Sequence, residues 1–66
     1  MKVRAEVFSP SGEGISVRIV DRATLTEAED ELFDWFNFEF SVGCSCSVDL
    51  LGGDDSVVEG LHDWHL

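Results

Sequence analysis

Basic residues are scarce in this chain of 66 residues, and they are confined to its first third. Lysine and arginine together number 4 against 14 aspartates and glutamates, which gives a formal net charge of −10 at pH 7. Direct binding to nucleic acids or to anionic lipid needs clustered lysine and arginine. The composition therefore argues against both, and no direct nucleic-acid contact and no membrane contact are expected.

Cysteine is also rare, and long apolar runs are absent. Two cysteines are too few for a disulfide framework, and a reducing, cytoplasmic location is the simplest interpretation. No apolar run approaches the roughly 20 residues that span a bilayer, and no charged-then-apolar leader opens the chain. Because 44% of the residues are hydrophobic, residues 1–66 are expected to form a single small acidic domain rather than a disordered tail.

The negative charge is distributed unevenly along the chain. All four bases and only three of the 14 acids lie in residues 1–22, which leaves 11 acids and no lysine or arginine in residues 23–66. Repulsion among those acids destabilises a compact fold. A compensating role in function or in environment is therefore expected.

Strict alternation of apolar and polar residues predicts two strands near the N-terminus, over residues 2–8 and 15–21. The only proline and two glycines lie between them, so the two strands are expected to form a hairpin. A register with Val7 opposite Val17 is favoured, because it sets Glu6 opposite Arg18. The side chains expected to point inward are Val3, Ala5, Val7, Ile15, Val17 and Ile19.

A helix is predicted after the hairpin. Thr24 with Glu27 and Thr26 with Glu29 both have the spacing of a capping box, so the helix can begin at either threonine. Asn37 is expected to end the helix. The apolar stripe that follows the cap at helical spacing is Ala28, Leu32, Trp35 and Phe36.

The longest alternating segment, residues 38–50, predicts a third strand with a bend at Gly43. A turn is expected over residues 51–55. The tail, residues 56–66, fits a short helix or a fourth strand, and the strand is favoured because a two-glycine turn precedes it. The third strand is expected to bury Phe38, Phe40, Val42, Cys44, Cys46, Val48 and Leu50.

These elements define an α+β fold in the order β-β-α-β-β. One helix is expected to pack on a small antiparallel sheet with strand order 2-1-3-4. The other face of the sheet is expected to be polar and open to water.

The cysteines and histidines raise the possibility of a metal or redox site. Cys44 and Cys46 point to one apolar face of the predicted strand, which favours two buried thiols. Together with His62 and His65 they have the donor types of a Cys₂His₂ zinc site. The spacing C-x-C is tighter than usual, however, and a strand turns the two histidines to opposite faces. Neither a metal nor a cofactor is expected.

Motifs for catalysis are missing. A cysteine nucleophile needs an electropositive pocket, which this acidic chain does not offer. The glycine pair of the predicted turn is followed by two aspartates, which repel phosphate. We therefore expect that the protein is not an enzyme.

The acids form two groups, one on the helix opposite the apolar stripe and one around the last turn and the tail. We expect them to form a continuous surface whose charge density approaches that of a DNA duplex and which binds the basic, DNA-binding surface of another protein. The candidate partner-binding residues are Glu27, Asp30, Glu31, Asp34, Glu39, Asp49, Asp54, Asp55, Glu59 and Asp63.

In size, acidity and α+β pattern, and without a catalytic motif, the chain resembles the small phage-encoded anti-CRISPR proteins of the acidic, DNA-mimicking kind. The resemblance covers the whole chain but includes no diagnostic motif, so it assigns no residue. It implies a non-enzymatic inhibitor of a CRISPR-Cas effector in the host bacterial cytoplasm. A type I surveillance complex, at its PAM- or DNA-binding surface, is the favoured target, bound by a monomer or weak dimer.

Two other interpretations stay open. A generic acidic adaptor domain of a salt-adapted organism would carry the same carboxylates only to hold water. A small Cys/His zinc or redox module would use the cysteines and histidines named above.

Overall fold

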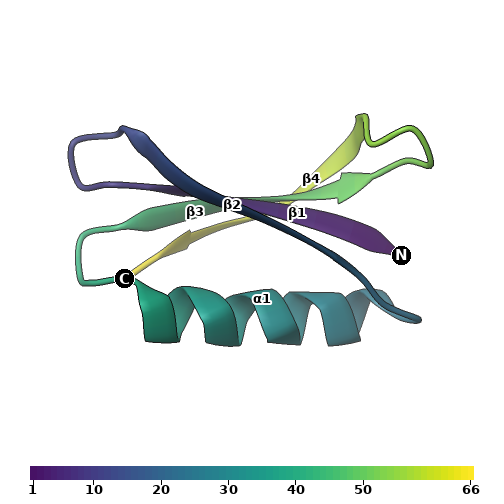
Figure 1. Ribbon diagram of the computed structural model, residues 1–66, viewed down its shortest axis with the longest axis horizontal. Helices are drawn as coiled ribbons and strands as arrows, with labels where there is room; N and C mark the ends of the chain where they lie inside the picture. Colours follow the sequence, from purple (N-terminus) through teal and green to yellow (C-terminus); the bar gives the residue numbers. More distant parts are fainter.

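A computed structural model describes residues 1–66 as a helix lying against one face of a four-stranded sheet (Figure 1). All neighbouring strands are antiparallel and their order is β2-β1-β3-β4. The predicted α+β fold and its strand order are confirmed. The helix is too short and too polar to cross a membrane. The elements are β1 (Lys2–Phe8), β2 (Gly14–Asp21), α1 (Leu25–Glu39), β3 (Ser45–Leu51) and β4 (Val57–His65).

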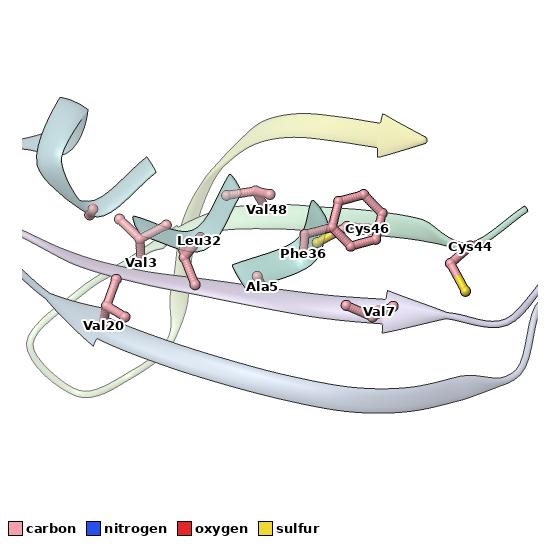
Figure 2. Close-up of a cluster of buried hydrophobic side chains, with 10 residues drawn as sticks. Val3, Ala5, Val7, Val20, Leu32, Phe36, Cys44, Cys46 and Val48 are labelled. Carbon is pink, nitrogen blue, oxygen red and sulfur yellow. The ribbon is translucent and has the colours of Figure 1, made fainter. Parts of the chain in front are cut away.

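The core lies between α1 and the inner face of the sheet (Figure 2). The helix contributes Ala28, Leu32 and Phe36 from the predicted apolar stripe, and Trp35 is half-buried at its flank. Because the side chains of a strand alternate between its two faces, the inward residues of β1 and β3 lie opposite the helix, as expected. The buried strand residues and their neighbours in the core are Val3, Ala5, Val7, Val20, Cys44, Cys46 and Val48.

The prediction for β2 was wrong by one residue. Val7 lies opposite Ser16, not Val17. The register then shifts between Val7 and Phe8, so that Phe8 lies opposite Gly14. A shift of one residue turns every side chain of a strand to the other face. Consequently, Glu6 lies opposite Val17 rather than opposite Arg18.

The outer face of the sheet is therefore apolar along β2 rather than uniformly polar. Ile15, Val17 and Ile19 point away from the helix and are 49%, 50% and 46% exposed. On the inner face, the Arg18 guanidinium lies 5.7 Å from the centre of the Trp35 ring. That cation–π contact gives the arginine a favourable place beside the core.

Of the two predicted helix starts, the structure has the one at Thr24. Its hydroxyl accepts a hydrogen bond from the backbone N–H of Glu27 at 3.2 Å, which satisfies one of the free donors of the first turn. The prediction that the helix ends at Asn37 was wrong. The Asn37 side chain instead donates to the carbonyl oxygen of Phe33 at 2.7 Å, within the helix, which continues to Glu39.

Residues 38–44 are consequently not part of a strand, which corrects the prediction for residues 38–50. Phe38 lies on the last helical turn and is 88% exposed, and Val42 is exposed in the loop. Gly43 has φ +100°, and a Cβ there would lie 2.9 Å from Pro10 Cγ. This backbone conformation and the close approach of the two loops both favour glycine.

The tail forms a strand, as favoured, rather than a helix. β4 pairs with β3, with irregularities between Val48 and Asp49 and between Leu50 and Leu51. Beyond β4, the amide of Leu66 donates to the carbonyl of Cys44 at 3.0 Å. The C-terminal residue is thereby fixed beside the loop that leads into β3.

Candidate partner-binding surface

The helix presents a carboxylate surface on the side that faces away from the sheet. Glu27, Asp30 and Asp34 are exposed, opposite the buried stripe of α1, and none of them has an ion-pair partner. These three residues are called the helix surface below. Glu31 lies at the flank of the helix, where its Oε1 accepts a hydrogen bond from Arg22 Nε at 2.9 Å. Its charge is therefore partly neutralised within the chain.

Asp49 of β3 and Asp63 of β4 lie on the opposite side of the sheet from the helix. Asp49 is opposite Arg4, and Asp63 is opposite Ser47. Their neighbours in the strands alternate into the core, so both carboxylates lie on the outer face of the sheet, away from the helix. The sheet separates them from the helix surface.

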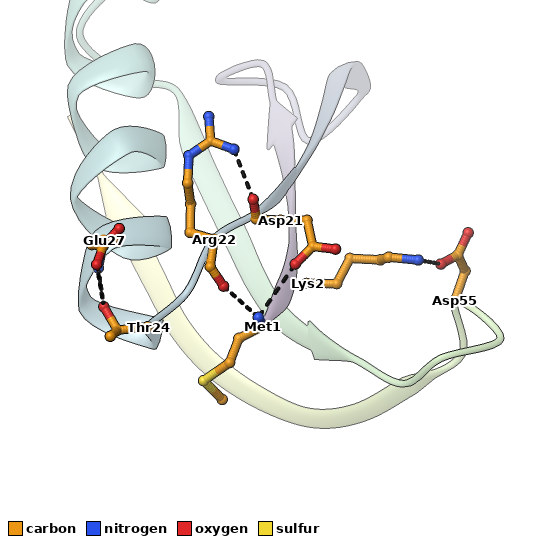
Figure 3. A network of polar contacts seen from close by, with 7 residues as sticks. All are labelled: Met1, Lys2, Asp21, Arg22, Thr24, Glu27 and Asp55. Atoms are coloured by element: carbon orange, nitrogen blue, oxygen red, sulfur yellow. Dashed lines mark hydrogen bonds and ion pairs between the residues drawn. The ribbon is translucent and has the colours of Figure 1, made fainter.

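The turn between β3 and β4 holds two acids with local partners. Asp54 Oδ1 accepts hydrogen bonds from Ser56 Oγ at 2.6 Å and from the Ser56 amide at 3.2 Å. The hydroxyl first, and then the amide, lower the pKa of Asp54. Asp55 forms an ion pair with Lys2, whose pKa this hydrogen bond and the attraction of the carboxylate raise (Figure 3).

The remaining two candidate acids are exposed at separate places. Glu39 is the last residue of α1, and Glu59 lies in β4 opposite Leu50. The ten candidate residues are thus not one continuous surface. They comprise the helix surface, the outer-face pair and the turn, with Glu31, Glu39 and Glu59 apart from these groups.

The few basic side chains of the chain are already engaged. Lys2 pairs with Asp55, Arg4 Nη2 lies 3.2 Å from Glu6, and Arg22 pairs with Glu31. The fourth base, Arg18, lies over Trp35. Five of the 14 acids have an ion-pair partner, counting the N-terminus and a histidine, which leaves nine without one. These nine are Glu13, Glu27, Asp30, Asp34, Glu39, Asp49, Asp54, Glu59 and Asp63.

Phe38 belongs beside the helix surface, although it was predicted to be buried. It follows Asp34 by four residues and Glu31 by seven, so it lies on the same side of α1. Extending the helical spacing beyond Asn37 would have identified this position. The result is an exposed aromatic ring at the C-terminal end of a row of carboxylates.

A second contact that the sequence did not reveal joins the helix to β4. His62 forms a hydrogen bond with Glu29, and its ring stacks on Trp64 at 5.5 Å between centroids. Trp64 in turn meets the edge of Phe33 at 5.0 Å. These contacts fix the helix over β4, and they occupy one of the two histidines.

The cysteines and histidines do not come together in a metal site. Cys44 and Cys46 are buried free thiols, and burial, assisted by Asp63, raises the pKa of Cys46 to about 11. In β4, His62 is opposite Val48 on the inner face and His65 is opposite Ser45 on the outer face. No group of three or more cysteine, histidine or acidic side chains is placed to hold a metal ion.

An open depression of about 250 Å³ lies at the irregular part of β4. Asp49, Asp63, His62 and Gly60 contribute to its lining. It contains no cysteine, serine or lysine that could act as a nucleophile beside a base.

The geometry defines the protein at the level of class: a small α+β domain with a carboxylate-bearing helix on one side and an open sheet on the other. Comparisons with protein-family models, with curated proteins and with solved structures gave no match.

Proposed function

We propose that this chain is a non-enzymatic binding protein whose helix surface occupies a basic, nucleic-acid-binding surface of another protein and excludes DNA from it. The observation that carries the proposal is the set of exposed carboxylates Glu27, Asp30 and Asp34, which have no internal cation although every base of the chain is engaged elsewhere. An external cationic surface would satisfy them.

The spacing of the helix surface supports a comparison with one strand of DNA. Seven residues separate Glu27 from Asp34, so the three carboxylates span about 10 Å of helix axis. A DNA strand carries one phosphate per roughly 3.4 Å of axis, so the two charge densities are of the same order. Lysines and arginines arranged to bind a phosphate backbone would therefore meet a similar row of charge on α1.

Phe38 supplies the apolar part of the proposed contact. Interfaces gain most of their affinity from a few buried anchors, and exposed aromatic side chains are frequent among them. The ring is 88% exposed and lies next to Asp34 on the helix. A partner that combines cationic side chains with an apolar pocket would bury it.

The resemblance described above suggests the identity of the partner at a finer level. We propose a CRISPR-Cas effector, and within that class the PAM- or DNA-binding surface of a type I surveillance complex. The chain would then act in the cytoplasm of a bacterial host. This finer proposal can fail while the coarser one, inhibition of a DNA-binding protein, holds.

The direct test measures binding of a labelled PAM-containing duplex to a purified type I surveillance complex in the presence of the chain. We expect the chain to displace the duplex, and the displacement to weaken as the salt concentration rises. The variant Asp30→Lys/Asp34→Lys should lose at least tenfold in inhibition. Phe38→Ala should lose inhibition without changing the salt dependence.

A matched control separates surface-specific binding from net charge. Glu13→Lys changes the charge by the same amount as Asp34→Lys, but Glu13 lies in the loop between β1 and β2 and is outside all candidate groups. We expect it to inhibit like the unchanged chain. Equal losses in Glu13→Lys and Asp34→Lys would contradict a role for the helix surface.

If the chain does not bind the surveillance complex, the finer proposal is wrong. The coarser proposal is then tested by capture from bacterial lysate, with duplex DNA as the eluent. It requires a captured DNA-binding protein that the duplex releases and that Asp30→Lys/Asp34→Lys does not capture. Absence of such a protein would overturn it.

A further inference from the structure

The two edges of the sheet differ in charge and regularity. β4 carries Glu59 and Asp63, has Gly60 in its middle and pairs irregularly at two places. Acids and irregular pairing on an exposed edge oppose the addition of another strand. This edge is therefore poorly suited to pairing with a further chain.

The β2 edge is more regular: over Ser16–Asp21 it has no glycine and no register shift, and its single acid, Asp21, is the last residue of the strand. Its only charged residues there are Arg18 and Asp21, and its pairing with β1 is regular up to Ser16. Its outer face exposes Ile15, Val17 and Ile19 to about half of their surface. A long, regular and apolar edge with unpaired backbone groups is a template for strand addition.

The charge distribution favours one kind of partner for this edge. Each copy of the chain carries a net charge of −10, so two copies repel one another over most of their surfaces. All four bases lie on β1, on β2 or directly after β2. The β2 side is thus where two copies approach with the least repulsion.

We propose that a second copy of this chain pairs with β2 in an antiparallel arrangement about a two-fold axis at Val17. In this register Val17 lies opposite its own counterpart, Ile15 lies opposite Ile19 of the second copy, and Ser16 lies opposite Arg18 of the second copy. A register centred on Arg18 would instead place two arginines opposite one another, which is unfavourable. The proposal is independent of the proposed function.

The paired strands would join two sheets into one of eight strands. The two-fold axis runs perpendicular to this sheet, so both helices lie on the same side of it. Apolar cross-strand contacts would cover part of the exposed surface of Ile15, Val17 and Ile19, and the unpaired backbone groups of β2 would gain hydrogen bonds.

Sedimentation tests the association. We expect a monomer–dimer equilibrium with a dissociation constant between about 1 µM and about 1 mM, which is a modest affinity. Raising the salt from about 0.01 M to about 0.15 M shortens the Debye length from roughly 30 Å to roughly 8 Å, and the dimer should become more stable. A monomer throughout these conditions would overturn the proposal.

Two lysine variants test the edge. Val17→Lys places two like charges at the two-fold axis and should give a monomer. Val57→Lys makes the same change at an exposed valine of the other edge strand and should dimerise at least as well as the unchanged chain. Dimerisation that survives Val17→Lys, or that is lost only in Val57→Lys, contradicts pairing through β2.

Disulfide trapping tests the register. Ser16→Cys mixed with Arg18→Cys should give a cross-linked heterodimer on oxidation, because these residues lie opposite one another in the proposed register. Two copies stacked through their outer faces would not cross-link there, because both residues face the helix side. The buried Cys44 and Cys46, 4% and 2% exposed, leave little background reaction. Cross-linking of Val17→Cys without the mixed pair would favour stacked faces and overturn edge pairing.

Discussion

Asp54 illustrates how a turn controls a single carboxylate. The hydroxyl and then the amide of Ser56 donate to Oδ1 and hold its pKa below the ordinary value. We predict that Asp54 titrates below the ordinary value of an aspartate, as measured by NMR of the carboxyl carbon. Ser56→Ala should raise the pKa part of the way back, since the amide bond remains. An unchanged pKa in Ser56→Ala would contradict the role of the hydroxyl.

The same hydrogen bonds imply a direction for stability against pH. The folded pKa of Asp54 is lower than that of the unfolded chain, so its contribution to stability is complete above the unfolded value of about 3.9. It is lost as the pH falls through the lower, folded value. Ser56→Ala should therefore lower the free energy of unfolding more at neutral pH than in strong acid. Urea unfolding at the two pH values measures this difference.

At the scale of elements, the first turn of α1 gives a matched pair of variants. Thr24 caps the helix, whereas Thr26 is exposed within the first turn. We predict that Thr24→Ala lowers the free energy of unfolding by about 1 kcal/mol, because the Glu27 amide loses its acceptor. Thr26→Ala should leave it unchanged or raise it slightly, since alanine favours the helix interior. Urea denaturation measures both, and equal effects would contradict Thr24 as the cap.

The C-terminal end of the same helix gives a second pair. Phe36 is fully buried against the sheet, whereas Phe38 is almost fully exposed. Phe36→Ala should cost about 3–5 kcal/mol, and Phe36→Leu provides a milder variant if the first does not fold. Phe38→Ala should change stability by less than about 0.5 kcal/mol. A large loss of stability from Phe38→Ala would contradict the exposure of this side chain. It would indicate that residue 38 lies in the core, as the alternating pattern predicted.

Alternation in the sequence failed at both ends of the helix for one reason. Residues 38–42 alternate as a strand does, yet the first two of them continue the helix, and their phenylalanine is exposed. In β2, alternation identified the strand but not which side faces the helix. A periodic pattern reports that two faces differ, and only the neighbouring elements decide which face is covered.

At the scale of the whole molecule, the net charge of −10 predicts a response to salt. Screening relieves repulsion among the nine acids without an ion-pair partner, so the melting temperature should rise with sodium chloride. Asp34→Lys should melt higher than the unchanged chain at low salt and respond less to added salt. Thermal unfolding followed by circular dichroism measures both. A melting temperature that is independent of salt would contradict destabilisation by repulsion.

The same experiment bears on the interpretation as a salt-adapted adaptor domain. A chain that folds only in molar salt would favour that interpretation over a binding role for the carboxylates. A chain that is folded at physiological salt and gains a few degrees more is expected if the carboxylates serve a partner.

The sequence by itself determined the fold class, the strand order, the two threonines that can cap the helix and the excess of acids over bases. These follow from periodicity, from hydrogen-bonding side chains and from composition, all of which are local or additive. Only the tertiary structure decided which face of β2 is exposed, and that the acids of the helix surface lie on the opposite side of the sheet from Asp49 and Asp63. Sidedness depends on where other elements pack, because a strand or helix carries two faces and covers only one.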